Sequence, residues 1–356
     1  MKKYAYHVVQ VGSFLAGLVL FVYLLRQTTL TVLGSYLEMM GWGFVLIVAL
    51  SVVRNCVRAG SWYFAIDPGQ RGISFCNLMN VMLAGEAIKY LTATGPLLGE
   101  PAKAAMVRRQ IPLLQGFSSV VVENLIYYLS VFIFMFASLP ALATLGEVPD
   151  SLKLSGYILM ALIAISVAVT TLAINRRWFL LARALEQLAT LTSRRRARQH
   201  NDVPVERTTW ASEANARQGR IGSIALQVRA VEHNLYTFYE QRRGAFYLIF
   251  WLNMGSHLIN VVEVYVILSL LKLPASLLFG FLIEAVTKVI NLVFFFIPTR
   301  AGVYESGNAL LLQSLGMSAA AGVALAIIRK LRAFLWVGYG LVVIGGMMLK
   351  KGSRRN

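Results

Sequence analysis

The sequence lacks the residues on which several kinds of chemistry depend. Its three aspartates, Asp67, Asp150 and Asp202, are scattered, whereas sites for Mg²⁺ and a diphosphate are usually built from clustered carboxylates. It contains no GxxxxGK[ST] loop to hold the phosphates of ATP and no HExxH zinc motif, and its four His and two Cys form no metal-ligand spacing. These absences argue against prenyl or phosphatidyl transfer and ATP-driven transport. We expect no catalytic residue, no metal and no cofactor.

Charged residues are also scarce, at 14% of the chain, whereas soluble domains have about a quarter. Hydrophobic residues make up 57%, and the mean hydropathy is +0.64. A spanning helix needs roughly 20 apolar residues. Six stretches qualify: 7–25, 43–66, 113–139, 154–174, 245–271 and 318–348. The first has no convincing cleavage site for a signal peptide, so we expect it to remain as a helix. The composition predicts an all-α polytopic membrane protein with about six full spans.

Of the net charge of +18, +7 lies in one segment between apolar stretches. Residues 176–243 contain 13 Arg and 6 Asp or Glu. Arg and Lys are enriched on the cytoplasmic side of membrane proteins, so this segment predicts orientation and contact with an anionic lipid surface rather than nucleic-acid binding. We expect surface helices on both sides of a polar loop, 193–220. The predicted organisation is a membrane half at 1–175, this Arg-rich segment, and a second membrane half at 244–356.

The distribution of Lys and Arg predicts that both termini are cytoplasmic. Lys2 and Lys3 precede the first stretch, and the C-terminal tail is basic. The alternation of sides works only if segments 74–109 and 274–316 each enter and leave the membrane on one side, as re-entrant hairpins from opposite faces. The first would enter from the cytoplasm and return there, with Lys103, Arg108 and Arg109 at the cytoplasmic surface. An ordinary kinked helix is the alternative for each.

Both segments contain helix-breaking residues followed by a glutamate. Irregular backbone at membrane depth is tolerated where it is buried in protein or lines a cavity. We therefore predict that these residues form the hairpin tips: Pro96, Gly99 and Pro101 in the first, Pro298 and Gly302 in the second. A similar span follows each hairpin, so the halves are predicted to be inverted repeats. Such repeats are typical of transporters, in which half-helix N-termini bind anions.

Ionisable residues inside spans are candidates for function because their insertion is costly. Arg54 and Arg58 share a helix face and could hold a phosphate, although Arg58 could instead extend to the membrane surface. Arg300 precedes the second tip helix; it would bind phosphate there or form an ion pair with Glu305. Arg329 follows in the next span, where pairing with Glu123 across the repeat axis is a further alternative.

Three other ion-pair or capping arrangements have both a structural and a functional interpretation. Lys89 lies three residues after Glu86, and Lys288 lies four residues after Glu284, so each pair could support the fold or face a substrate. Glu100 and Glu305 would cap short helices or contact cationic headgroup parts. His257, in an apolar span, is expected to be a hydrogen-bonded core residue.

Two motifs carry a resemblance to a known family. IPTRAGVYESGNALLLQSLGMSAAAGVALAIIRKL resembles the signature of the lysylphosphatidylglycerol synthetase transmembrane family, a flippase-like domain, with Pro298, Gly302, Glu305, Gly316 and Arg329 at the matching positions. GPLLGEPAKAAMVRR is similar to its Gly-Glu-Pro element. The family is implicated in moving aminoacylated phosphatidylglycerol and other lipids across the bacterial inner membrane. Because the sequence given stops at Asn356, the resemblance implies a member without the soluble aminoacyl-transferase domain.

The leading hypothesis is a lipid translocase of the bacterial inner membrane that moves a phospholipid or a polyprenyl- or hopanoid-type lipid between leaflets. The alternative is a membrane enzyme or accessory subunit that uses Glu100 and Glu305 as acid and base. The predicted substrate-binding residues are Arg54, Arg58, Lys89, Glu100, Arg300, Glu305 and Arg329.

Overall fold

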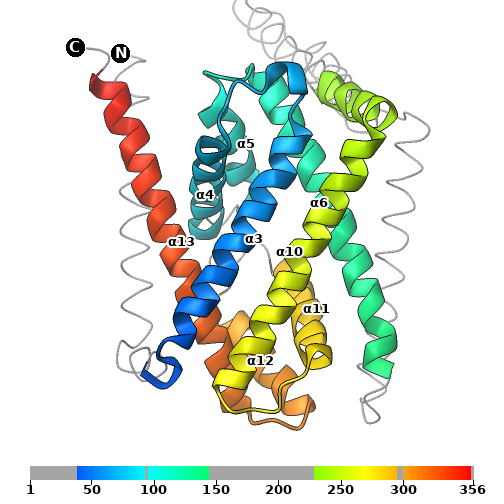
Figure 1. Ribbon diagram of the computed structural model, residues 1–356, viewed down its shortest axis with the longest axis vertical. Helices are drawn as coiled ribbons and strands as arrows, with labels where there is room; N and C mark the ends of the chain where they lie inside the picture. Colours follow the sequence, from blue (N-terminus) through cyan, green and yellow to red (C-terminus); the bar gives the residue numbers. More distant parts are fainter. Residues whose placement is uncertain (1–37, 93–94, 144–227, 295–299, 301, 354–356) are drawn as a thin grey trace, which may run out of the picture. The chain divides into compact units, whose positions relative to one another are not determined.

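The computed structural model describes residues 38–92, 95–143, 228–294, 300 and 302–353. Within these residues every regular element is a helix (Figure 1). Residues 228–246 belong to a second unit of the chain, in which 228–241 are helical; apart from 243–246, which begin a long helix, they are not considered further. The expected spans 7–25 and 154–174, both termini and most of the Arg-rich segment, including the loop 193–220, lie outside the described residues.

Four long apolar helices form the frame of the main unit. They are α3 (Gly43–Ala65), α6 (Leu113–Ala143), α10 (Arg243–Leu270) and α13 (Ala319–Ser353). Each contains a stretch long and apolar enough to cross a membrane. Four of the six predicted spans are therefore confirmed as helices of spanning length. Figure 1 shows that α3 and α13 run toward one end of the unit, whereas α6 and α10 run toward the other, which is the alternation that the basic residues predicted.

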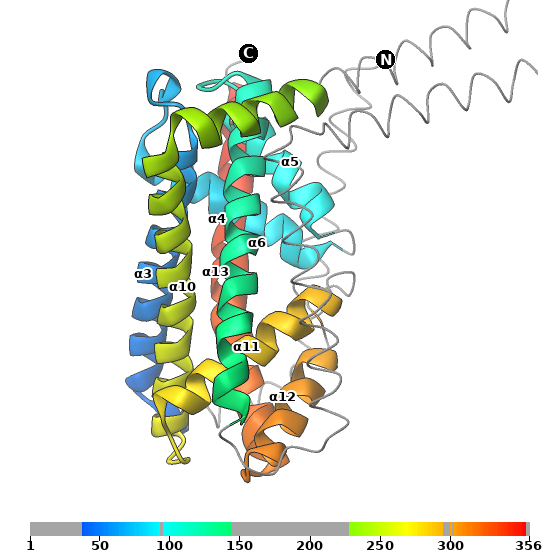
Figure 2. The same ribbon diagram turned by 90° about the vertical axis from the view of Figure 1, so that its right-hand side faces the viewer.

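Two pairs of shorter helices lie between these spans. The first helix pair is α4 (Phe75–Leu91) and α5 (Pro96–Val107), and the second is α11 (Leu277–Val293) and α12 (Val303–Ser314). A 17-residue helix is about 25 Å long and a 12-residue helix about 18 Å, less than the roughly 30 Å of bilayer hydrocarbon. The pairs lie toward opposite ends of the unit in both views (Figure 2).

The two halves share more than the order of their elements. In each, a span is followed by a 17-residue helix, a 12-residue helix and a second span. A serine caps the first short helix of each pair: Ser74 Oγ accepts from the Asn77 amide at 3.4 Å, and Ser276 Oγ accepts from Phe279 at 3.1 Å. A glycine with positive φ precedes each second short helix, Gly95 at 40° and Gly302 at 82°. These shared features and the opposite helix directions support the predicted inverted repeat.

Each helix pair packs against the final span of the other half. In one contact, α4 packs on α13 through a buried cluster of Ala84, Ala87 and Leu91 with Val337 and Leu341. In the other, α11 packs on α6, where the rings of Phe281 and Phe134 meet edge to face at 4.8 Å. The halves therefore interlock, and the C-terminal ends of α4 and α11 both face the middle of the unit.

The long helices place polar residues inward and large apolar residues outward. On α10, Asn253, His257, Asn260 and Glu263 are buried at helical spacing, whereas Trp251 is 65% exposed. His257 Nε2 contacts Ser130 Oγ at 3.0 Å, so the expectation of a hydrogen-bonded core histidine is confirmed. An apolar exterior around a polar interior is the arrangement expected of helices surrounded by lipid.

Candidate functional site

A cavity of about 250 Å³ lies where the two helix pairs meet. Its wall is formed by α3, α4, α10, α11 and α13, together with Tyr127 of α6, Tyr304 of α12 and Arg300 in the connection before α12. The volume is below the roughly 300–1,000 Å³ of pockets for drug-sized ligands. It suits a small polar group rather than a whole lipid.

The wall of this cavity is strongly cationic. Two carboxylates line it, Glu86 and Glu284. Seven cationic side chains line it: Arg54, Arg58, Lys288, Arg300, Arg329, Lys330 and Arg332. Arg54 and Arg58, which the sequence placed on one helix face, both line the cavity, as do Arg300 and Arg329.

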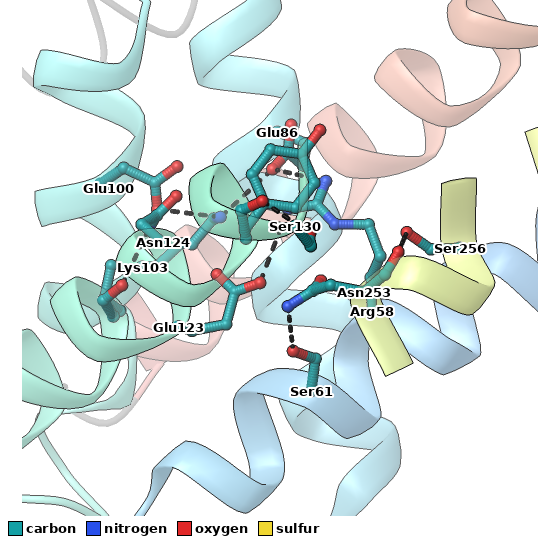
Figure 3. A network of polar contacts seen from close by, with 12 residues as sticks. Arg58, Ser61, Glu86, Glu100, Lys103, Glu123, Asn124, Ser130, Asn253 and Ser256 are labelled. Atoms are coloured by element: carbon teal, nitrogen blue, oxygen red, sulfur yellow. Dashed lines mark hydrogen bonds and ion pairs between the residues drawn. The ribbon is translucent and has the colours of Figure 1, made fainter. Parts of the chain in front are cut away.

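The first ion-pair network connects α3, α4, α5 and α6 beside the cavity (Figure 3). Glu86 accepts from Lys103 at 3.2 Å and from Lys89 and Arg58 at 3.4 Å. Glu100 contacts Lys89 and Lys103, both at 3.0 Å. Arg58 also lies 3.9 Å from Glu123, which Figure 3 shows pointing toward it. The expected pair of Glu86 and Lys89 is thus confirmed.

The second ion-pair network connects α10, α11, α12 and α13. Glu284 accepts from Arg329 at 2.6 Å and contacts Lys288 at 2.9 Å, which confirms the pair expected at this spacing. Arg329 also approaches Glu263 at 3.6 Å. Arg332 donates to Glu263, and Lys330 donates to Glu305. The carboxylates therefore connect the second helix pair and α10 to α13.

Arg54 and Arg300 differ from the other cations of the cavity wall. Neither has a carboxylate oxygen within 4 Å among the described residues. Arg54 donates instead to the neutral amides of Asn260, at 3.3 Å, and Asn55, at 3.1 Å. The Nε atoms of both arginines are buried without a hydrogen-bond partner, a feature that they share with the other arginines of the wall. We refer to Arg54 and Arg300 as the surplus cations.

Lys89, Glu100 and Glu305 do not line the cavity. Lys89 and Glu100 contact each other in the first network, and Asn124 also donates to Glu100, at 2.9 Å. Glu305 accepts from the Gly302 amide at 2.9 Å and from Lys330, so the capping interpretation of Glu305 is confirmed. The function that the sequence assigned to these three residues remains a prediction.

The residues predicted at the hairpin tips lie at several different positions. Pro96 is the first residue of α5, whereas Gly99 and Pro101 lie inside that helix. Gly99 allows α5 to approach α4, because a Cβ there would lie 2.9 Å from the Gly85 carbonyl oxygen. Gly302 is the N-cap of α12, and Pro298 lies outside the described residues.

The structure contradicts two alternatives that the sequence left open and one expectation. Glu123 does not pair with Arg329: its contact is Arg58, and Arg329 is held by Glu284 and Glu263. Arg300 does not pair with Glu305, whose partner is Lys330. Lys103, expected at the cytoplasmic surface, is 3% exposed in the first network. Glu123 and Glu305 each lie closer to a different cation, and Lys103 is buried against Glu86 and Glu100.

Sequence reasoning also missed residues that help to build the site. Asn260 and Glu263 of α10 are buried, and Asn260 donates to Glu284 at 3.0 Å while it accepts from Arg54. Asn253 donates to Ser61 at 2.9 Å. The sequence contained a signal for these residues, because polar side chains recur at helical spacing within an apolar stretch, at Asn253, Asn260 and Glu263.

These features together define a polytopic helical membrane protein with a charged interior. The chain belongs to the family described as the lysylphosphatidylglycerol synthase TM region, whose model matches residues 9–341. The suspected family is thereby confirmed, and with it a membrane domain linked to lipid handling. Neither a curated protein nor a solved structure matches the chain.

Proposed function

We propose that this protein is a lipid translocase, which moves a lipid with a phosphate headgroup between the leaflets of the bacterial inner membrane. One observation carries the proposal: a cavity lined by seven cationic side chains and only two carboxylates, enclosed within a frame of spanning helices. Buried cations at membrane depth are costly unless they are paired or serve a ligand. A headgroup phosphate supplies the missing negative charge while its acyl chains stay in lipid.

The two helix pairs provide the mobile parts in this proposal. They would be re-entrant hairpins that enter from opposite faces and meet at the cavity, as in transporters built from inverted repeats. Ion pairs and packing tie each pair to a span, so breaking one set of contacts would open the cavity toward one leaflet. The end at which α3 and α13 finish would face the cytoplasm, with both termini on that side.

Transport is favoured over catalysis by the positions of two glutamates. An acid and a base must reach the same substrate atom. Glu100 and Glu305 are engaged in different networks, and neither lines the cavity. We therefore propose that the protein is not an enzyme.

A leaflet-resolved exchange assay tests the proposal. Purified protein is reconstituted in vesicles that contain a fluorescent phospholipid, and an impermeant quencher reports how fast the inner-leaflet probe becomes accessible. We expect faster exchange than in protein-free vesicles, and slower exchange when Arg54→Gln and Arg300→Gln are combined. Arg109→Gln, an exposed residue outside the cavity, is the matched control. Exchange no faster than in empty vesicles, for every phospholipid tried, would overturn the proposal.

A further inference from the structure

The two ion-pair networks differ in their charge balance. In the first, three cations face three carboxylates, and each side chain has an opposite charge within 4 Å. In the second, four cations face three carboxylates: Lys288, Arg329, Lys330 and Arg332 against Glu263, Glu284 and Glu305. The excess positive charge therefore lies on the side of the second network, and the surplus cations add to it.

Among the described residues, the cavity wall and the two networks together carry a net charge of +3. Arg54 and Arg300 supply two, and the second network supplies one. Arg54 is desolvated, and its repulsion by Arg332 and Arg58 is offset only in part by Glu263 and Glu284. Its hydrogen-bond partners are neutral. Arg332 is 7% exposed and shares its carboxylate partner, Glu263, with Arg329. Arg54 and Arg300 are both half-buried. A cation that is partly removed from water without an opposite charge is costly, so an anion at this part of the wall would be stabilising.

The carboxylates of the cavity wall offer little to a cationic headgroup. Glu86 is contacted by Arg58, Lys89 and Lys103. Glu284 is contacted by Lys288 and Arg329 and by the amide of Asn260. A headgroup ammonium would have to displace one of these cations, and it would then lie near the surplus cations, Arg54 and Arg300. Like charges brought together in a desolvated site cost several kcal/mol.

We propose that the cavity selects a lipid phosphomonoester or diphosphate, with two or three negative charges and no ammonium group. This inference rests on the proposed function and narrows it. A lysylated phosphatidylglycerol has a net positive headgroup and would add to the excess positive charge of the cavity. The inference therefore excludes the lipid whose synthase gives the family its description. Arg54 and Arg300, as planar donors with unpaired N–H groups, would bind the phosphate oxygens directly.

Three lipids of graded headgroup charge test the selectivity in the exchange assay: phosphatidic acid, phosphatidylglycerol and lysylphosphatidylglycerol, each with the same acyl chains and label. We expect exchange to fall in that order, with phosphatidic acid at least about tenfold faster than the lysylated lipid, a difference of 1.4 kcal/mol. Combining Arg54→Gln with Arg300→Gln should reduce this ratio by about tenfold, whereas Arg109→Gln should leave it unchanged. Equal or faster exchange of lysylphosphatidylglycerol overturns the inference and leaves the proposed function standing.

A binding measurement decides the selectivity even when no exchange is observed. The thermal unfolding temperature of the purified protein is measured in detergent with each lipid, and separately with inorganic phosphate or diphosphate. Stabilisation by phosphatidic acid alone, lost in the double variant, supports the inference when no exchange of any lipid is detected. Equal stabilisation by all three lipids contradicts it. Stabilisation by inorganic diphosphate as strong as that by phosphatidic acid would assign the cavity to a soluble anion and overturn the lipid assignment.

Discussion

Arg329 of α13 donates a hydrogen bond from Nη2 to Oε2 of Glu284 on α11 at 2.6 Å, and the two side chains are 5% and 1% exposed. This contact joins the second helix pair to the final span of its own half. Because Glu284 also contacts Lys288 and Asn260, its carboxylate connects three helices at the cavity wall. The same residues that line the cavity therefore also stabilise the fold, and mutations should separate these contributions.

Removing a paired carboxylate should destabilise the protein strongly. Glu284→Gln leaves Arg329 and Lys288 buried with less compensation, and the loss of one partner of a buried ion pair costs about 3–5 kcal/mol. Denaturant unfolding in detergent, followed by tryptophan fluorescence, measures the change. Glu38→Gln, at an exposed position, should have little effect. An unfolding free energy for Glu284→Gln equal to that of the Glu38 control would show that the pair adds no stability.

Removing a surplus cation should leave the free energy of unfolding unchanged or increase it. Arg54→Gln takes away a charge whose hydrogen-bond partners are amides and whose repulsion by Arg332 and Arg58 exceeds its attraction by Glu263 and Glu284. The variant should therefore be as stable as the parent or more stable. Lipid exchange should nevertheless be slower. Arg329→Gln is the matched comparison, because it removes a paired arginine from the same cavity wall and should destabilise. Strong destabilisation by Arg54→Gln would make Arg54 a structural residue.

Double variants should distinguish the true partner of Glu305. Lys330→Gln leaves this carboxylate without its ion pair, and adding Glu305→Gln should recover part of the lost stability. Arg300→Gln has no such pair to break, so combining it with Glu305→Gln should bring no recovery. The unfolding free energies of the parent, the three single variants and the two double variants give the two coupling energies. Coupling between residues 300 and 305 that exceeds the coupling between 330 and 305 would contradict the observed pairing.

The sequence predicted the main features of the fold because they depend on local properties. Apolar length predicted the four described spans, and breaker residues at matching places predicted the two helix pairs. The pairs of Glu86 with Lys89 and Glu284 with Lys288 were predictable because residues three or four apart share a helix face.

Contacts between distant segments could not be predicted in the same way. Lys103 was assigned to the membrane surface because a lysine after a hairpin usually marks the cytoplasmic side, yet the approach of α5 to α4 buries it beside Glu86. Arg329 has two glutamates within reach, and the packing of α13 against α11 and α10 decides between them and Glu123. Such choices depend on tertiary geometry, which spacing along one helix does not contain.

Close packing of α13 against α12 should depend on a glycine. A Cβ added at Gly322 would lie 2.3 Å from the Asn308 carbonyl oxygen and 2.5 Å from the Ala309 Cα, so backbone would have to move. Gly322→Ala should lower the unfolding temperature and the yield of folded protein. Gly346→Ala on the same helix meets nothing within 4 Å and should be neutral or stabilising by up to about 1 kcal/mol. Equal effects of the two substitutions would rule out a packing role for Gly322.

The opposite placement of the two helix pairs gives a prediction about membrane topology. Cys76 is exposed near the start of α4, and Pro274 is exposed just before α11, at the other end of the unit. In a Cys56→Ser background, Cys76 should react with an impermeant maleimide only after the cells are permeabilised, because its end is proposed to face the cytoplasm. With both native cysteines replaced by serine, a cysteine introduced as Pro274→Cys should react in intact cells. Reaction of both positions from one side would contradict the inverted arrangement, whereas an exchange of their sides would keep the fold and reverse its orientation.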